Sequence, residues 1–469
     1  MKNIRTWIKK LSTAGFLILL AWTLACTPED EVITESMQAQ LAFSTDTVFF
    51  DTLFTDTLSF TRRFRVYNRN DNAVNISSIR LAQDQSSPYS IWVNGVRGKS
   101  FSDQVLMGGD SLLILAEVTI ASRDENTPFF VEDLVEFNTN GNQQSVHLVA
   151  WGQDAYFFRQ DAILACNTTW PADKPHVLYG SVLVDDDCSL TIEPGAQIFL
   201  NQGSSLFIEG TLKAEGTAQD RIRFQNVRLD IKDAPGQWTG IFFLEGTKNN
   251  RLDFTVIRNG EVGIRLGAPD NDTIPDVVVS NTIIENMSGT GILAFNSDLH
   301  AYNVLIDNCI NGAVGNFAGG NYYYEHCTFA NYSFGIFAEA PGVVVTDNLI
   351  LADESLLIND INFQLQNCIV WGDSQMGEEL VLNNEGGADF TALLSNNLIR
   401  STEEVYNINS NVLGTSPDFP SFLDPANFDY HLDSLSPAKD LGLPSLILRD
   451  LDDSLRDALP DIGAYERFE

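Results

Sequence analysis

The pattern of apolar and polar positions repeats through the second half of the chain. In six stretches, two apolar residues bracket a polar one, a polar marker follows, and an apolar run comes next. The markers are spaced by 22, 23, 21, 20 and 29 residues and are Asn281, Asn303, His326, Asp347, Asn367 and Asn396. The position two before each marker is apolar in every copy: Val279, Ala301, Tyr324, Val345, Leu365 and Leu394. The position three after it is apolar too: Ile284, Ile306, Phe329, Ile350, Val370 and Ile399. This recurrence predicts coils stacked around a shared interior, which is a solenoid.

A third strand in each coil is predicted where a glycine precedes an apolar residue, as at Gly263, Gly291, Gly312 and Gly335. Three short strands in about 22 residues predict a triangular coil whose successive turns pair in parallel. Less regular rungs extend the pattern back toward Val177, and the last ends near Val412. With their flanks, we assign residues 165–415 to the solenoid.

Residues 41–154 have a different pattern, made of short alternating strands. Phe64 and Val66 alternate with Arg63 and Arg65, and similar runs lie near residues 76–81, 90–93, 112–120, 134–137 and 145–151. So many short strands in about 110 residues predict a β-sandwich. The segment resembles the immunoglobulin-like modules that precede solenoids in bacterial surface proteins, and we expect it to be a spacer or docking module.

The first 25 residues combine a basic start with an apolar stretch, residues 16–24, that ends at Cys26. This is typical of a secretory signal, and it resembles a bacterial lipoprotein signal in which Cys26 becomes lipidated, although Thr23 replaces the usual aliphatic residue. Residues 26–40 then form an acidic tether. We expect an outer-membrane lipoprotein exposed at the cell surface. The alternatives are the periplasmic leaflet, an ordinary signal peptide and a single membrane anchor.

The chain is strongly acidic, with 28 Lys and Arg against 63 Asp and Glu and a net charge of -35. Residues 1–25 hold four of the cations and no acid, so removing them leaves -35 - 4 = -39. Such a field repels nucleic acid, which we exclude as a partner. The acidic run of residues 450–453 could bind Ca²⁺, but it lacks the spacing of a calcium loop, and a turn or a solvated surface explains it more simply. The same holds for residues 185–187, and no other cofactor is expected.

Five cysteines remain after Cys26. Cys166 and Cys188 flank the start of the solenoid, and they are the pair to test for a disulfide. Cys327 and Cys368 each follow a marker and are placed two rungs apart by the alignment. At about 4.8 Å per rung this separation is too large for a bridge, so we expect buried thiols. Without a Cys-x-x-Cys pair, zinc is not expected.

Three segments resemble a known family. Residues 190–196 are similar to the opening coil of bacterial right-handed β-helix proteins. Ser436–Gly442 and Pro460–Glu466 closely resemble the closing segment of many secreted members, written S-P-A-x-D-x-G and D-I-G-A-Y-E. Between them, Asp453 stands where that family often has glycine, so the turn there is expected to differ. The resemblance implies an all-β chain: a right-handed parallel β-helix preceded by a β-sandwich and closed by a C-terminal cap, residues 416–469. A cap is also required physically, because the last coil exposes an unpaired edge.

The markers themselves admit two interpretations. A column of side chains such as Asn281, Asn303 and Asn367, with a second column of Asn259, Asn286, Asn308 and Asn331, could hold a ligand or a metal. A structural account is stronger, because asparagine tolerates a left-handed corner and its amide can bond the next coil to form a ladder. His326 is then a substitute at one corner.

The same register places side chains on an exposed sheet face. Positions one and three before the marker point outward, and in adjacent rungs they are His300, Tyr302, Tyr323 and Glu325, with Gln364 and Gln366 two rungs further on. Two aromatic rings with a histidine and a carboxylate could form a platform for stacking a sugar ring. The other interpretations are a catalytic site and ordinary cross-strand pairing.

The family resemblance also implies candidate reactions, since right-handed β-helices include pectate lyases and polygalacturonases. Fold alone does not establish an activity. Lyases need an acidic Ca²⁺ cluster with a basic residue, and hydrolases need paired carboxylates. The rungs are poor in Lys and Arg, and no hydrolase motif is evident, so we assign no catalytic residue. We expect non-catalytic binding or adhesion, with carbohydrate as the ligand. A polysaccharide lyase or glycoside hydrolase, and a structural spacer, are the alternatives.

Overall fold

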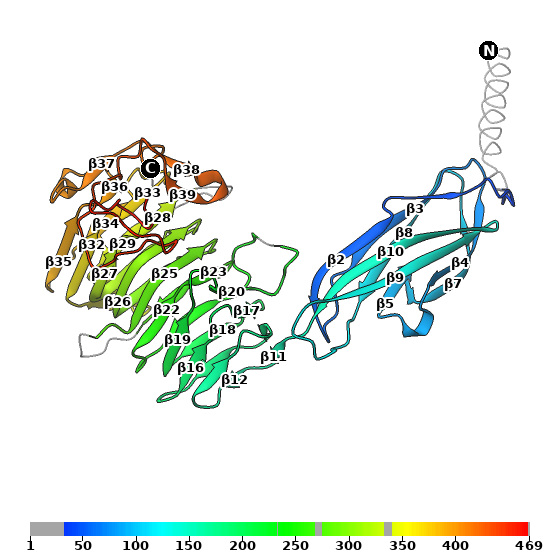
Figure 1. Ribbon diagram of the computed structural model, residues 1–469, viewed down its shortest axis with the longest axis horizontal. Helices are drawn as coiled ribbons and strands as arrows, with labels where there is room; N and C mark the ends of the chain where they lie inside the picture. The colour runs from blue at the N-terminus through cyan, green and yellow to red at the C-terminus, as the bar shows by residue number, and fades with distance from the viewer. Residues whose placement is uncertain (1–31, 232, 268–273, 333–339, 468–469) are drawn as a thin grey trace, which may run out of the picture. The chain divides into compact units, whose positions relative to one another are not determined.

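The computed structural model describes residues 32–231, 233–267, 274–332 and 340–467 (Figure 1). The chain divides after Asp154 into two compact units. The predicted lipidation site Cys26 and its signal lie outside the described residues. No helix in the described part of the chain is long and apolar enough to cross a membrane.

The first unit is a β-sandwich, as predicted. One sheet has the order β1-β3-β8-β5-β6: Leu41–Phe43, Arg62–Asn68, Ser111–Val118, Tyr89–Val93 and Val96–Gly98. The other has the order β2-β10-β9-β4-β7: Thr47–Phe54, Asn142–Gln153, Phe129–Thr139, Val74–Leu81 and Ser100–Leu106. Alternate residues such as Phe64, Val66, Val146 and Leu148 fill one core between them. β9 and β10 are joined at Asn140 and Gly141, whose positive φ angles of 50° and 81° make the tight hairpin turn. A short 3-10 helix, Asp84–Ser86, precedes β5.

The second unit is built on one 25-stranded sheet in which most strands pair in parallel with the strand three places later. This register gives three faces, which we name A, B and C. Face A contains β12 (Ala162–Ile163), β15 (Val182–Val184), β18 (Ser205–Ile208), β21 (Gly240–Phe243), β24 (Ile264–Leu266), β29 (Val343–Thr346) and β34 (Leu380–Asn383). Face B contains β13 (Thr168–Trp170), β16 (Ser189–Ile192), β19 (Thr211–Glu215), β22 (Asn250–Asp253), β32 (Ile361–Gln366) and β35 (Phe390–Ser395). Face C contains β11 (Tyr156–Phe158), β14 (His176–Leu178), β17 (Gln197–Leu200), β20 (Ile222–Asn226), β23 (Thr255–Arg258), β28 (Thr328–Asn331), β33 (Ile369–Gly372), β36 (Leu398–Arg400) and β37 (Val412–Gly414).

Three longer strands turn corners between the faces. β25 (Val277–Glu285) runs from face B to C, β26 (Ile292–Asp307) passes through A, B and C, and β27 (Val314–Glu325) runs from A to B. Additional elements are the hairpins β30 (Asn348–Ile350) with β31 (Leu356–Ile358) and β38 (Phe422–Asp424) with β39 (Asp429–Leu432), and the 3-10 helices Glu404–Tyr406 and Pro425–Asn427. The first coil starts at Tyr156, before the predicted start.

The recurrent apolar positions do line a shared interior. Val279, Ala301, Val345 and Leu365 are at most 1% exposed. One rung of the predicted register is nevertheless wrong. β29, which holds Val345, pairs with Val314–Phe317 on face A, and β32 is the strand that follows β27 on face B. The cause is the inserted hairpin β30–β31, which follows a run of valines that imitates a face B rung. Asp347 is therefore not a corner marker, and Ile350, in the hairpin, is exposed.

The marker columns form ladders, which confirms the structural account of them. At the corner between faces B and C, Asn281, Asn303, His326, Asn367 and Asn396 all have positive φ angles of 46 to 54°. Asn303 donates to Asn281 at 3.0 Å, and Asn367 bonds His326 at 2.9 Å. At the corner between C and A, Asn308 donates to Asn286, which donates to Asn259. Asn331 departs from this column, because its amide donates to Glu379.

The cysteines fall into two groups. Cys166 and Cys188 are bridged and join the first two coils. Cys327 and Cys368 are free and buried, as expected, but they lie in adjacent coils rather than two apart. The backbone N–H of Cys327 donates to the Cys368 Sγ at 3.3 Å. The error has the same source as the misplaced rung at Asp347. Cys309 is also free and buried.

The closing segment, which we define as residues 416–467, lies along the side of the solenoid. Its apolar residues Tyr430, Leu432, Leu451, Ile462 and Ala464 form a second core with outward residues of face C such as Leu305, Ile369 and Leu398. In Figure 1 the red C-terminal chain passes over the strands of the later coils. The sequence predicted a cover for the edge of the last coil, whereas these contacts run along several coils.

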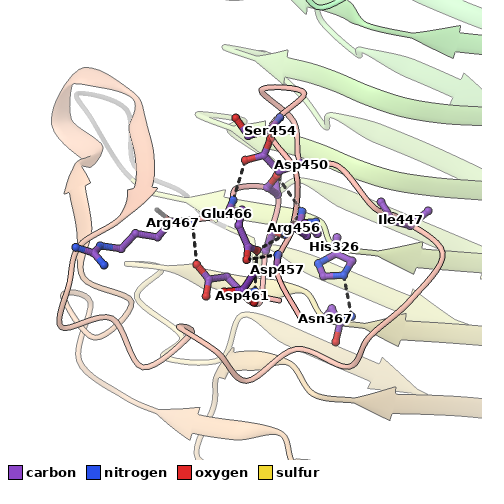
Figure 2. A network of polar contacts seen from close by, with 12 residues as sticks. His326, Asn367, Ile447, Asp450, Ser454, Arg456, Asp457, Asp461, Glu466 and Arg467 are labelled. Carbon is purple, nitrogen blue, oxygen red and sulfur yellow. Dashed lines mark hydrogen bonds and ion pairs between the residues drawn. The ribbon is translucent and has the colours of Figure 1, made fainter. Parts of the chain in front are cut away.

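A buried polar network holds the closing segment together (Figure 2). Arg456 pairs with Glu466 at 3.2 Å, and both side chains are at most 3% exposed. Glu466 also accepts the backbone N–H groups of Asp457 and Asp461. Asp450 accepts those of Ser454 and Glu466. The D-I-G-A-Y-E acids are therefore structural, because each satisfies backbone donors that would otherwise be buried without partners.

Candidate functional site

The predicted platform residues lie on the outward side of face B, in adjacent coils. His300 is opposite Tyr323, and Tyr302 is opposite Glu325. Between them in sequence, Ala301 and Tyr324 point into the core. The His300 ring meets the ring of Tyr323 edge-on at 4.7 Å between centroids and lies 5.6 Å from that of Tyr302. The structure thus brings the three rings into one cluster.

Glu325 is the hydrogen-bonded centre of the platform, and at 6% exposed it is buried rather than exposed as predicted. Its carboxylate accepts the Tyr323 hydroxyl at 2.8 Å and the Gln366 amide at 3.2 Å. Gln364 and Gln366 are the cross-strand partners of Tyr323 and Glu325. They therefore lie one coil onward, not two, because the misplaced rung at Asp347 is absent from this face. The contiguous platform is one rung more compact than predicted.

The electrostatic environment keeps His300 and Tyr323 uncharged at neutral pH. Burial lowers the pKa of His300, and the nearby Glu325 carboxylate only partly opposes this. Burial, followed by the hydrogen bond to Glu325, raises the pKa of the Tyr323 hydroxyl far above neutrality. Neutral rings with fixed hydroxyl groups suit stacking and hydrogen bonding better than proton transfer at neutral pH.

Tyr302 connects the platform with an open groove. Its hydroxyl accepts a hydrogen bond from Arg251 at 3.4 Å, and Arg251 pairs with Glu215 at 3.2 Å. The groove lies between the corner of faces B and C and the closing segment. It is lined by Tyr302, Phe254, Asn281 and Asn303 on the solenoid side and by Leu446, Ile447, Leu448, Arg449, Asp453 and Leu455 on the other. Its walls are mainly apolar, with amide and charged groups between them.

Comparison with known proteins identifies the solenoid. A family model described as "Right handed beta helix region" matches residues 176–334. The described residues of this range form a right-handed parallel β-helix. A comparison with curated proteins gives no significant match.

Several solved structures resemble the chain at low identity. The catalytic unit of a thermostable GH87 alpha-1,3-glucanase from Streptomyces thermodiastaticus is 10% identical, with 72% of this chain and 73% of that chain covered and a TM-score of 0.27. The Agl-KA catalytic domain is 10% identical, with 79% and 90% covered and a TM-score of 0.23. The ASH / PapD-like domain of human CEP192 is 11% identical, with 27% and 92% covered and a TM-score of 0.18.

Paired carboxylates, which a hydrolase requires, occur in the β-helix without any sequence motif. On face C, Glu285 lies opposite Asp307, but Asp307 is only 1% exposed. Its pKa is raised well above the usual range by burial and by Glu285. On face B, Glu215 lies opposite Asp253, whose carboxylate accepts the side chains of Ser280 and Asn281. Glu285 pairs with Arg258 and Glu215 pairs with Arg251, while Asp307 is buried beside Tyr430 of the closing segment. Neither pair is assigned a catalytic role.

The acidic runs that suggested Ca²⁺ are used within the chain. Asp450 accepts backbone N–H groups, Asp452 bonds His431 at 2.8 Å, and Asp453 pairs with Arg449. Asp453 has a φ of 65°, so it adopts the left-handed turn that a glycine would take, and the expected difference at this position is not seen. Asp187, in the other run, also turns with a φ of 56°. Among the described residues, no group of three or more His, Cys, Asp or Glu is arranged to hold a metal.

Sequence reasoning missed the groove because one of its walls comes from the closing segment, some 150 residues beyond Tyr302. The wall is recognised from exposure, which the structure supplies. Leu446 and Leu448 stand on either side of the partly buried Ile447, and Leu446, Leu448 and Leu455 are 94%, 66% and 59% exposed. Exposed leucines so close together indicate a surface that faces something other than bulk water.

Proposed function

We propose that the protein is a lipid-anchored surface protein that binds carbohydrate through face B and the adjoining groove. The position of Tyr302 carries this proposal, since its ring belongs to the aromatic platform and also lines the groove. A ligand lying in the groove would reach the Tyr302 ring for stacking and the side chains of Leu446 and Leu448 on the opposite wall at the same time.

The composition of the site supports a neutral sugar. Sugar rings have apolar faces that stack on aromatic side chains and hydroxyl edges that need fixed donors and acceptors. His300, Tyr302 and Tyr323 supply the first, while the partly exposed Gln364 and Gln366 supply the second. Glu325 holds Tyr323 and Gln366 in place through its hydrogen bonds. Catalysis is not part of this proposal, because the cross-strand partners of Glu325 are Tyr302 and Gln366 rather than a second carboxylate.

The test compares a double tyrosine variant with a single-tyrosine control on a glycan array, followed by calorimetry with the best ligand. Tyr302→Ala combined with Tyr323→Ala should weaken binding at least tenfold. Tyr156→Ala is the control, because Tyr156 is another surface tyrosine stacked on a histidine of the same solenoid, 5.0 Å from the ring of His176. Equal binding by the double variant and the wild type would reject the proposal. Release of new reducing or unsaturated ends from polysaccharide would show an enzyme instead.

The anchor is tested separately. Lipidation at Cys26 predicts that the wild type enters the detergent phase on phase separation and that Cys26→Ser stays in the aqueous phase, since acyl chains contribute about 0.8 kcal/mol per buried methylene. Digestion of the protein by protease added to intact cells would place it at the cell surface. Protection until the outer membrane is opened would place it in the periplasmic leaflet.

A further inference from the structure

The outward positions of face A are apolar through most of the β-helix. In successive coils the same column holds Phe207, Phe242, Arg265, Leu293, a glycine, Val344 and Val381. We call the six side chains of this column the face A stripe. A sheet face that meets water normally alternates polar residues outward. In the column given above, Arg265 is the one charged side chain.

Face C has a similar outward column, but it is covered. Leu305, Ile369 and Leu398 are 3%, 1% and 0% exposed, because the closing segment packs on them. In contrast, none of the six residues of the face A stripe is buried. One chain thus contains an apolar sheet face with its polypeptide cover and a second apolar sheet face without one among the described residues.

Two aromatic rings of face A lie close to glycines of the same strand. A Cβ added to Gly240 would come within 3.2 Å of the Phe242 ring, and one added to Gly315 within 2.6 Å of the Phe317 ring. Each ring therefore occupies space that the glycine two residues before it leaves free. Phe317 stacks on Phe295 in the next coil with centroids 5.7 Å apart.

Arg265 stands in the middle of this surface, between two rings. Its guanidinium carbon lies 5.6 Å from the centroid of Phe242 and 5.5 Å from that of Phe295. Within the described residues no carboxylate pairs with Arg265, although the chain has 63 acids and 28 bases. Ring stacking on both sides holds the guanidinium in place and leaves its edge donors available.

We propose that the face A stripe docks a polypeptide partner whose contacting surface is apolar and carries a carboxylate that pairs with Arg265. Phenylalanine and arginine are enriched at the centres of protein interfaces. From Phe207 to Val381 the stripe spans six coil-to-coil steps of about 4.8 Å, or about 29 Å, which an extended segment of about nine residues would cover. The covered face C shows that such a column packs against polypeptide in this protein.

Two other occupants fit less well. Carbohydrate needs several convergent polar groups, and five of the six stripe residues have none on their side chains. A second copy packed face to face about a two-fold axis would bring its Arg265 toward the first, because Arg265 lies near the middle of the stripe, and like charges there oppose association.

The experiment selects peptides from a phage-displayed library of random 12-residue peptides on the purified full-length protein. Enriched peptides should combine apolar residues with Asp or Glu. Arg265→Glu and Phe242→Asp should each weaken their binding at least tenfold. The control Lys213→Glu reverses an exposed charge on face B and should change nothing, and Tyr302→Ala with Tyr323→Ala should also have no effect. A peptide whose acid is changed to Lys should regain affinity for Arg265→Glu.

Several results would overturn the proposal. These are the absence of any enriched peptide, peptides that bind Arg265→Glu as well as the wild type, glycan binding that depends on Arg265, and self-association that Arg265→Glu abolishes. All variants are checked for an unchanged unfolding midpoint. If Phe242→Asp fails to fold, Arg265→Glu with the charge-exchanged peptide decides the matter alone.

Discussion

Faces A and C of the solenoid both carry apolar residues on their outward side, but these residues differ in their exposure to solvent. Both carry outward apolar columns over many coils, and both are joined to the same interior. Outward residues of face C such as Leu305 and Ile369 are buried because the closing segment covers them, whereas the corresponding positions of face A remain partly exposed. Alternation along a strand therefore tells which residues point inward and which outward, but whether an outward residue meets water depends on chain that arrives from elsewhere.

The closing segment, which covers face C, is attached through the corner ladder as well as through apolar contacts. Asn303 donates to the carbonyl of Arg449 at 2.7 Å, Asn367 to that of Leu443 at 2.9 Å, and Asn396 to that of Leu441 at 2.8 Å. These amides have two tasks, since Asn303 and Asn367 also bond the previous coil. The corner that was expected to hold coils together also anchors the closing segment.

The largest expected effect comes from Arg456, which ties the cover together. Arg456→Ala leaves Glu466 as a buried carboxylate without its cation, and breaking a buried pair in this way costs about 3 to 5 kcal/mol. Urea unfolding should show the loss, and limited proteolysis should release the closing segment before the solenoid unfolds. The side chain also donates to Asn303, so the nearest coil is affected too.

Arg449 supplies the matched control for this prediction. It lies in the same segment, but its side chain is 53% exposed and its partner Asp453 is 40% exposed. Exposed pairs contribute about 0 to 1 kcal/mol, so Arg449→Ala should be nearly silent. Equal losses for the two variants would mean that the Arg456 network does not hold the cover.

A leucine on each face tests the comparison directly. Leu305 on face C is 3% exposed, and Leu293 on face A is partly exposed at the equivalent outward position of the same strand, β26. Leu305→Ala should cost about 2 to 5 kcal/mol through lost burial and a cavity. Leu293→Ala should cost less than about 1 kcal/mol. Equal costs, measured by urea unfolding, would show that face A is covered as well.

Sequence reasoning succeeded where a feature depends on neighbours in the coil. The interior positions and the left-handed corners follow from local periodicity, as do the inward and outward directions of His300 to Glu325. The position of Cys166 and Cys188 at the start of the solenoid made them the pair to test, and they are bridged. It failed at Asp347 because three consecutive valines satisfy a face A strand and a face B rung equally well. Only the pairing of β27 with β32 distinguishes the two.

The groove and the cover could not be predicted for a different reason. Both depend on where residues 416–467 return, and contacts such as Asn303 with Arg449 join residues 146 positions apart. The closing motifs predicted a cap, but nothing local states which surface it covers. The apolar residues of the face A stripe can be read from the sequence, but their exposure cannot, because it depends on whether a distant segment returns to cover them, and no described segment does.

A corner between faces C and A gives a smaller effect. Asn286 has a φ of 61° and is hydrogen bonded to Asn259 and Asn308. Asn286→Ala should cost about 2 kcal/mol, because it loses buried hydrogen bonds and disfavours the left-handed backbone. Asn286→Gly keeps the backbone and loses only the bonds, so it should cost less. If the glycine variant is the less stable in thermal unfolding, the backbone contribution is absent.

The smallest and most specific effect is a pH dependence in how firmly the closing segment is held. His431 bonds Asp452 and Asp429 and stacks on Tyr465 at 4.0 Å. The bond to Asp452, followed by that to Asp429, raises the pKa of His431 to about 9, although burial opposes this. The same bond lowers the pKa of Asp452, while burial keeps Tyr465 neutral, and Arg221 is the other cation near Asp452.

The direction of this pH dependence follows from the pKa of His431 in the folded and in the unfolded protein. Because the folded pKa of His431 lies above its unfolded value of about 6.5, the stabilisation is fully present below that value and is lost as the pH rises through about 9. The wild type should therefore resist protease release of the closing segment better than His431→Gln at pH 6, and the difference should vanish by pH 10. Because the site is partly exposed, salt should reduce the difference at pH 6. A difference that persists unchanged at pH 10 would mean that His431 acts through packing on Tyr465 and not through its charge.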